Sequence, residues 1–229
     1  IDLNSRDSNN ETLLHITTKE GYLESTQYLI SFDKIDITAK DNKGNTILHN
    51  ACKNDNLELI QYLISLDKLD INNKTEDDET PLHFAIYNEK LPIIKYLTSL
   101  PGIDLNIKDE NDKTLLHLAS NASENESITN YLLSLNQIQI DAKDKEGRTI
   151  LHYACQNESL DLIKTLTKRP ELDVTATDSE GMNILHIACE WANDINIIRF
   201  IVSLNKINVN DKSNDGNTPL LRICNNSDS

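Results

Sequence analysis

The residues of this chain that could carry out chemistry are its six histidines and four cysteines. Imidazoles and thiolates ligate metal ions and serve as acid–base catalysts or nucleophiles when they cluster. The histidines instead recur every 34 or 35 residues, each as the fourth residue of Thr-x-Leu-His or its Asn variant: His15, His49, His83, His117, His152 and His186. Repeated units pack about 8–10 Å apart, whereas zinc–nitrogen bonds are about 2.0–2.1 Å long. We therefore expect a structural role for each imidazole, and no metal or catalytic site.

The cysteines share a second fixed position, six residues after the start of that motif, at Cys52, Cys155, Cys189 and Cys224. Small or apolar residues fill this position in other repeats, which predicts packed thiols. The nearest pairs lie one repeat apart, beyond the roughly 7 Å between Cα atoms that a disulfide allows. Reduced thiols and the absence of a secretory signal in the first residues favour the cytosol, or alternatively the nucleus. A redox role for one thiol stays open.

The elements that position these side chains follow from the same repeat. Pro81 and Pro219 come directly after the motif's Thr, as expected of a first helical position with Thr as the N-cap. Glycines two residues before the Thr or its Asn183 substitute predict a turn with positive φ. An apolar helical spacing then marks a second helix. We place six units at 7–40, 41–74, 75–108, 109–143, 144–177 and 178–212, with partial units at 1–6 and 213–229.

This pattern resembles the ankyrin repeat family, which is marked by Thr-Pro-Leu-His in units of about 33 residues. The resemblance implies an all-α repeat solenoid of helix-turn-helix units joined by β-hairpin-like loops. It also implies that each His ties a hairpin to its helix, and that hairpin tips and first helices line a concave binding groove. We expect residues 1–229 to form a single repeat domain, monomeric and cut from a longer array.

Two irregularities mark particular repeats. One extra residue falls between the helices at 121–125 and again at 190–194, where a surface turn tolerates it. Glu126 replaces the Leu or Ile of other units, and this predicts local opening in the fourth repeat.

Composition excludes several classes of function. With 22 Lys+Arg against 37 Asp+Glu, the net charge is −15, which argues against nucleic acid or an anionic membrane as partner. No apolar run is long enough to span a bilayer, so no direct membrane insertion is expected. Phosphate-cradling and nucleophile-elbow motifs are absent. We therefore expect neither an enzyme nor a cofactor.

Function is then expected at exposed positions that vary between units. Trp191 is the sharpest candidate, as a binding hot spot or as packing over its lengthened turn, and Tyr87 and Met182 join the same predicted surface. The hairpin tip at 76–79 holds four consecutive acids, either a solvated run or a pocket for a basic segment. The remaining tips vary as well. The predicted partner-binding residues are Trp191, Met182, Tyr87, Glu76, Asp77, Glu79, Glu146, Arg148 and Glu180.

Two functions fit these features. The first is a non-catalytic scaffold that binds a protein partner, possibly one with a basic segment. The alternative is a substrate-recruiting or regulatory segment of a larger enzyme or channel, because the chain begins and ends inside repeats.

Overall fold

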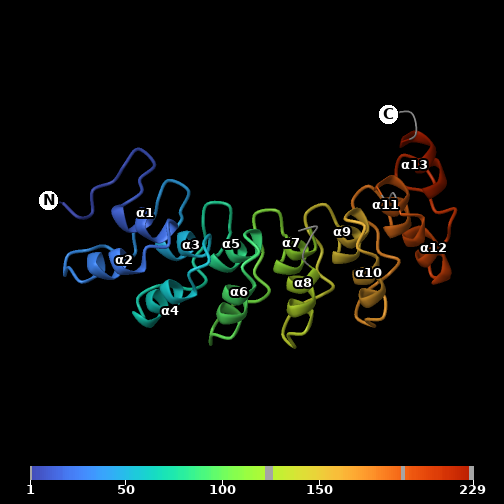
Figure 1. Cartoon of the computed structure of the whole chain (residues 1–229). Helices are drawn as coiled ribbons and strands as arrows, with labels where there is room; N and C mark the ends of the chain where they lie inside the picture. The colour runs from blue at the N-terminus through green and yellow to red at the C-terminus, as the bar shows by residue number, and fades with distance from the viewer. Residues whose placement is uncertain (1, 122–125, 192–193, 227–229) are drawn as a thin grey trace. The chain divides into compact units, whose positions relative to one another are not determined.

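The computed structural model describes residues 2–121, 126–191 and 194–226, with side chains as far as residue 224. The chain forms two compact units, Ile1–Glu110 and Asn111–Ser229. Within the described residues there are thirteen helices, two in each of six repeats and one in a seventh (Figure 1). The first helices are α1 Leu13–Lys19, α3 Ile47–Ala51, α5 Pro81–Tyr87, α7 Leu115–Asn121, α9 Ile150–Gln156, α11 Ile184–Trp191 and α13 Pro219–Asn226. The second helices are α2 Leu23–Ile30, α4 Leu57–Ser65, α6 Leu91–Thr98, α8 Glu126–Leu133, α10 Leu160–Leu166 and α12 Ile195–Ser203.

The repeated motif starts each first helix. Thr46 is the N-cap of α3, in extended conformation, and its side chain accepts the backbone N–H of His49 while the His49 ring accepts the Thr46 N–H. The same reciprocal box caps α1, α5 and α9. Such a cap stabilises a helix by about 1 kcal/mol. Pro81 occupies the first turn of α5, as predicted.

Two layers of helices build each unit. In the first unit α1 packs on α3 and α3 on α5, and in the second unit α7, α9, α11 and α13 pack in order. Each complete repeat also packs its second helix against its own first helix. Leu48, Ile60 and Leu63 are fully buried between these helices. Burial of one such side chain contributes about 1.5–3 kcal/mol, and helices this short need that packing to form.

The loops that join the repeats turn tightly. In the second repeat the Asp41 N–H donates to the Asn45 carbonyl at 3.0 Å, and Gly44 adopts φ +77°. Asn10, Asp78 and Asp112 hold the same position in other repeats and also have φ near +60°. Thus the predicted positive φ is confirmed, even where glycine is replaced. Among the described residues β pairing is limited to isolated bridges such as Arg6–Thr12, so these hairpins are turns without strands.

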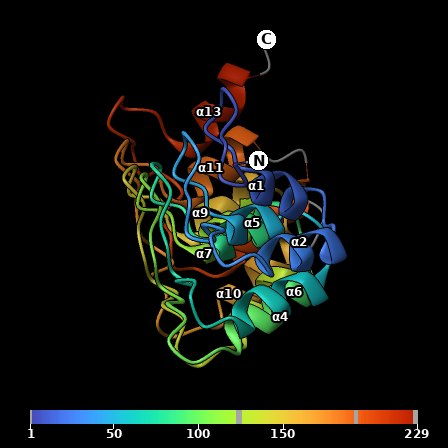
Figure 2. The ribbon, with the colours of Figure 1, turned by 90° about the vertical axis from the view of Figure 1, so that its left-hand side faces the viewer.

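Successive hairpin tips are joined by backbone hydrogen bonds. In the first unit Glu76 N–H donates to the Lys43 carbonyl at 3.0 Å. In the second unit Ser179 N–H donates to the Glu146 carbonyl at 2.7 Å. Figure 2 shows the loops of neighbouring repeats running side by side, apart from the helices. The tips therefore form a registered row within each unit.

Three expectations about packing need correction or restriction. Cys224 is exposed, because α13 is the last helix of the structure and its outer side is open. Tyr28 shares its repeat position with Tyr62, Tyr96 and Tyr131, which predicts a core residue, yet it is 67% exposed on α2. Glu126 begins α8 at an exposed position that Ile195, 52% exposed, also occupies in α12, so the acid costs no burial there. The predicted insertions at 121–125 and 190–194 lie largely outside the described residues, and local opening stays a prediction.

Candidate functional site

The histidines hold the hairpins to the helices. Because the Thr46 N–H donates to Nδ1 of His49 at 3.1 Å, the ring proton belongs on Nε2. This Nε2 lies 3.2 Å from the Glu79 carbonyl of the following hairpin and donates to it. His15, His152 and His186 contact the carbonyls of Asn45, Met182 and Asn217 in the same way. The predicted local hydrogen bonding is confirmed for these four rings, whereas Nε2 of His83 is buried and meets no hydrogen-bond partner among the described residues.

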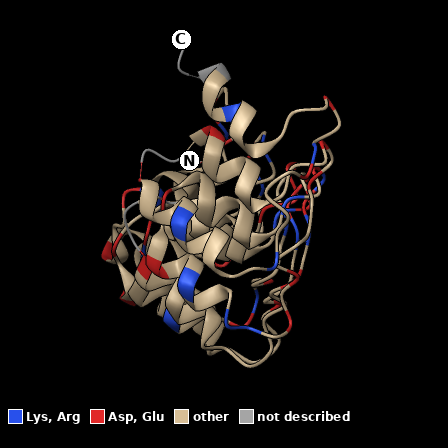
Figure 3. Ribbon diagram, turned by 90° about the vertical axis from the view of Figure 1, so that its right-hand side faces the viewer, with Lys and Arg blue, Asp and Glu red and all other residues tan. Residues whose placement is uncertain are grey.

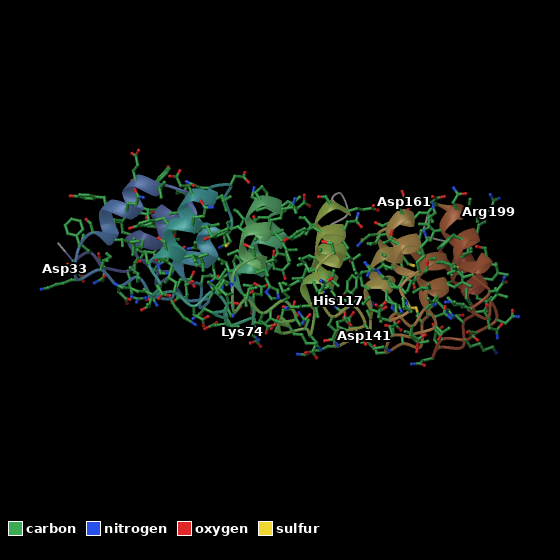
Figure 4. All side chains as sticks on the ribbon, turned by 90° about the horizontal axis from the view of Figure 1, so that it is seen from below. Asp33, Lys74, His117, Asp141, Asp161 and Arg199 are labelled. Carbon is green, nitrogen blue, oxygen red and sulfur yellow. The ribbon has the colours of Figure 1, made fainter. Side chains whose placement is uncertain are left out.

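Burial makes three of the rings poor acids and bases near neutral pH. Burial lowers the pKa of His49 and of His83 to about 4, and it lowers the pKa of His152. Figure 4 shows His117 of the second unit between the loop edge, marked by Asp141, and the opposite edge, marked by Asp161 and Arg199. No three His, Cys, Asp or Glu side chains among the described residues gather in a way that could hold a metal ion.

The buried thiols are similarly unreactive. Cys52, Cys155 and Cys189 are buried, so the prediction of packed cysteines holds for three of the four. Burial raises the pKa of Cys52 and Cys155 above the usual range and that of Cys189 to about 11. A thiol is nucleophilic only as thiolate, so these three side chains act as small apolar groups.

Two exposed aromatic side chains stand out at the ends of first helices. Trp191 ends α11 and is 53% exposed, and Tyr87 ends α5 and is 49% exposed. Met182, predicted to belong to the same surface, is only 4% exposed. Its backbone N–H is held by the Asp178 carboxylate at 2.9 Å, and its side chain is buried. Met182 therefore offers no side chain to a partner, and that expectation was wrong.

The acidic tip of the third repeat contacts Tyr87 through a hydrogen bond. Glu76, Asp77 and Asp78 are exposed, whereas Glu79 is half-buried and accepts a hydrogen bond from the Tyr87 hydroxyl. Burial and the nearby carboxylates of Asp77, Asp109 and Glu110 raise the pKa of Glu79. Burial and the Glu79 carboxylate raise the pKa of Tyr87. The structure thus brings Asp77, Glu79 and Tyr87 together.

Some of the charged side chains on the other predicted tips form ion pairs within the protein. Arg148 pairs with Glu146 at 3.0 Å and approaches the buried Asp178 at 3.9 Å, so its guanidinium is engaged within the protein. Glu146 and Glu180 remain exposed. Figure 3 shows acidic and basic residues mixed along the loops, while the helices carry few charges. Glu146 and Glu180 remain candidates by exposure alone.

A pocket that the motif reading missed lies in the first unit. Lys19 and Lys53 occupy the same position of successive repeats, as does Tyr87 in the third. Together with Lys43 of the second hairpin tip, both lysines line one cavity of about 340 Å³. The signal in the sequence was a pair of lysines one repeat apart in an acidic chain. We call this cavity, with its lining residues Asn9, Glu11, Lys19, Asp41, Asn42, Lys43, Asn45 and Lys53, the lysine pocket.

Comparisons with known proteins agree with the repeat geometry. A family described as ankyrin repeats (3 copies) matches residues 1–75 and 82–178, and one described as ankyrin repeats (many copies) matches residues 166–220. No curated protein matches the chain. None of the helices in the described part of the chain has the length and apolarity needed to cross a bilayer. With stacked two-helix repeats, capping boxes built from Thr and His, and family matches over most of its length, the chain belongs to the ankyrin repeat family.

Proposed function

We propose that this protein is a non-catalytic scaffold that binds a protein partner through its hairpin tips and the exposed ends of its first helices. Ankyrin repeats are generally modules for protein–protein interaction, and proteins built from them are typically non-catalytic. The observation that carries the proposal is the division of roles within each repeat. The motif residues are consumed by caps and packing, whereas the residues that end the first helices are exposed and differ in chemistry, as Lys19, Tyr87 and Trp191 do.

Trp191 is the proposed anchor of the interaction. A tryptophan that is 53% exposed at the end of α11 offers a large, rigid contact area. Burial of such a side chain by a partner contributes about 2 kcal/mol or more, which corresponds to more than tenfold in affinity. Tyr87 plays the matching part in the first unit, where its ring is half exposed beside the acidic tip.

The acidic tip gives the partner a proposed charge. The raised pKa of Glu79 reports crowding of negative charge around Asp77, in addition to burial. A basic side chain from a partner would relieve this repulsion, and opposite charge would raise the association rate. We therefore propose that the partner presents a basic segment to this tip.

Location and assembly complete the proposal. We place the protein in the cytosol or nucleus as a monomer. Cys52, Cys155 and Cys189 are buried thiols that form no disulfide, which suits a reducing compartment.

Affinity capture with the whole chain as bait tests this function. Trp191→Ala should weaken retention of the captured partner by about tenfold or more, while the melting temperature stays nearly unchanged. Tyr28→Ala is the matched control, because Tyr28 is 67% exposed but lies on a second helix. If Trp191→Ala lowers the melting temperature and leaves binding intact, Trp191 packs and does not bind. Turnover of any substrate, abolished by one point mutation, would refute the scaffold.

A further inference from the structure

The lysine pocket lies between the tips of the first two hairpins and the ends of α1 and α3. Lys19 ends α1, Lys53 follows α3 by two residues, and Lys43 lies on the second tip. Burial lowers the pKa of Lys53, and the nearby Lys19 lowers it further. Three lysines therefore line one cavity in a chain whose net charge is −15.

Lys53 is held in place by neutral groups. Its Nζ donates to Oδ1 of Asn50 at 3.1 Å, and the amide of Asn50 donates in turn to the His15 carbonyl. On another side the Nζ lies 4.9 Å from the centre of the Phe84 ring. Neither Lys53 nor Lys43 has a carboxylate within ion-pair distance in the described part of the chain. Lys53 is thus preorganised, half-buried and without a counter-ion.

The two acids that line the pocket, Asp41 and Glu11, favour the charged form of Lys53 but form no ion pair with it in the described part of the chain. The Oδ1 atom of Asp41 accepts the backbone N–H groups of Lys43 and Asn45, each at 2.8 Å, and its Oδ2 atom accepts the Asn45 amide. Asp41 is therefore committed to its own turn. Glu11 approaches only Lys19, at 3.8 Å. Three lysines against two carboxylates leave one positive charge, which matches a single monovalent anion.

We propose that the lysine pocket binds the carboxylate of an Asp or Glu side chain from the protein partner. This inference rests on the proposed function and deepens it. The charge of the pocket selects a carboxylate over a phosphate dianion, which would leave the pocket negative. The Asn42 amide on the tip already donates to the Ser8 carbonyl, so the ammonium groups supply most of the recognition.

A neighbouring cavity extends the binding surface toward the acidic tip. It has a volume of about 240 Å³, shares Lys43, Asn45 and Lys53 with the lysine pocket, and is lined further by Phe84, Asp77 and Glu79. A partner segment that places its carboxylate in the lysine pocket therefore passes the Phe84 ring before it reaches the acids. The partner is expected to carry an acidic residue followed, in space, by a basic one.

Nuclear magnetic resonance on the whole chain tests the pocket directly. The lysine side-chain methylene signals are followed while acetyl-Gly-Glu-Gly-amide, the matching Gln peptide or inorganic phosphate is added. The Glu peptide should shift the Lys53 and Lys43 signals saturably, with a lower dissociation constant than phosphate. The Gln peptide should not shift these signals. Lys53→Met keeps the apolar stem over Phe84 and should weaken Glu-peptide binding by about fivefold or more. Lys68→Met, at an exposed lysine just after α4, is the matched control and should change nothing.

The outcomes separate this inference from the function on which it rests. Equal shifts with the Gln peptide, or tighter binding of phosphate, would overturn the pocket as a carboxylate site. If Lys53→Met fails to fold, Lys43→Ala at the exposed tip takes its place with the same expectation. A captured partner whose binding is unaffected by either lysine variant would refute the pocket and leave the scaffold intact. Saturable Glu-peptide binding without any captured protein would support the pocket and count against the scaffold.

Discussion

The imidazole of His49 joins the start of its own helix to the next hairpin, and those of His15, His152 and His186 do the same in their repeats. Nδ1 of His49 accepts the Thr46 N–H at the start of its helix, and Nε2 donates to the Glu79 carbonyl in the next hairpin. Only a neutral ring has one acceptor and one donor in this arrangement. The buried histidines therefore stabilise the fold in a form that acid removes.

Acid should destabilise the protein between pH 6.5 and 4. Burial holds the folded-state pKa of His49 and of His83 at about 4, below the usual value of about 6.5. In this window the unfolded chain binds more protons, so the free energy of unfolding falls as pH falls, by up to about 1.4 kcal/mol per pH unit for each such histidine. Denaturant unfolding at several pH values measures this slope.

His49→Gln is the variant that isolates one ring. Glutamine at this position retains a capping box with Thr46 but does not titrate. Unfolding of the variant should therefore take up about one proton fewer than unfolding of the unmodified protein between pH 6.5 and 4. An unchanged slope would show that His49 is not protonated on unfolding in this range.

At the scale of the hairpin, glycine serves two separate purposes. Gly44 and Gly216 occupy the same position and have φ of +77° and +84°. A Cβ at Gly44 would lie 3.1 Å from the backbone nitrogen of Glu76 and 3.2 Å from the Cα of Thr75, whereas a Cβ at Gly216 would meet nothing within 4 Å. The first glycine permits both a left-handed turn and a close neighbour, and the second permits the turn alone.

Gly44→Ala should therefore destabilise the protein more than Gly216→Ala. Both variants carry the strain of a positive φ, about 1 kcal/mol, and only Gly44→Ala also pushes two hairpin tips apart. Differential scanning calorimetry of the two variants compares them. Equal losses of melting temperature would mean that the contact between tips contributes nothing.

At the scale of the whole molecule, stability comes from the packing of each repeat against the adjacent repeats. The first helix α11 packs against α9 and α13, whereas α13 leaves Leu220 68% and Leu221 47% exposed. In an array stabilised by nearest-neighbour contacts, a helix covered on one side opens at a lower free energy than one covered on both.

Amide hydrogen exchange should reveal this gradient within the second unit. We expect amides of α13 to exchange at least about tenfold faster than those of α11, since local opening of an uncovered helix requires less free energy. Peptide-resolved mass spectrometry measures both helices in one experiment, and α9 serves as the internal reference. Uniform protection from α9 to α13 would contradict the nearest-neighbour account.

Much of this could be predicted from the sequence because it is local. The Thr and His of a capping box lie three residues apart, so their contact follows from the motif alone. Exposure of Trp191 followed from its register. Met182 was placed wrongly because a residue on a tip can still turn its side chain inward. The lysine pocket was missed because Lys19 and Lys53 come together only when different repeats stack.

The row of hydrogen-bonded tips restricts where the sequence can gain or lose residues. Each tip is hydrogen-bonded to the tip before it within its unit, as the Glu76 N–H is to the Lys43 carbonyl. A residue gained or lost in a tip would therefore break hydrogen bonds to both neighbouring tips. The turns between the two helices of a repeat are joined to the preceding repeat by side chains instead, as the Asn54 amide is to the Thr18 carbonyl and the Asn56 amide to the Gly21 carbonyl. The 35-residue units have their extra residue in these turns. A foreign peptide grafted into this protein should therefore be placed in such a turn, where it leaves the backbone hydrogen bonds between the tips intact.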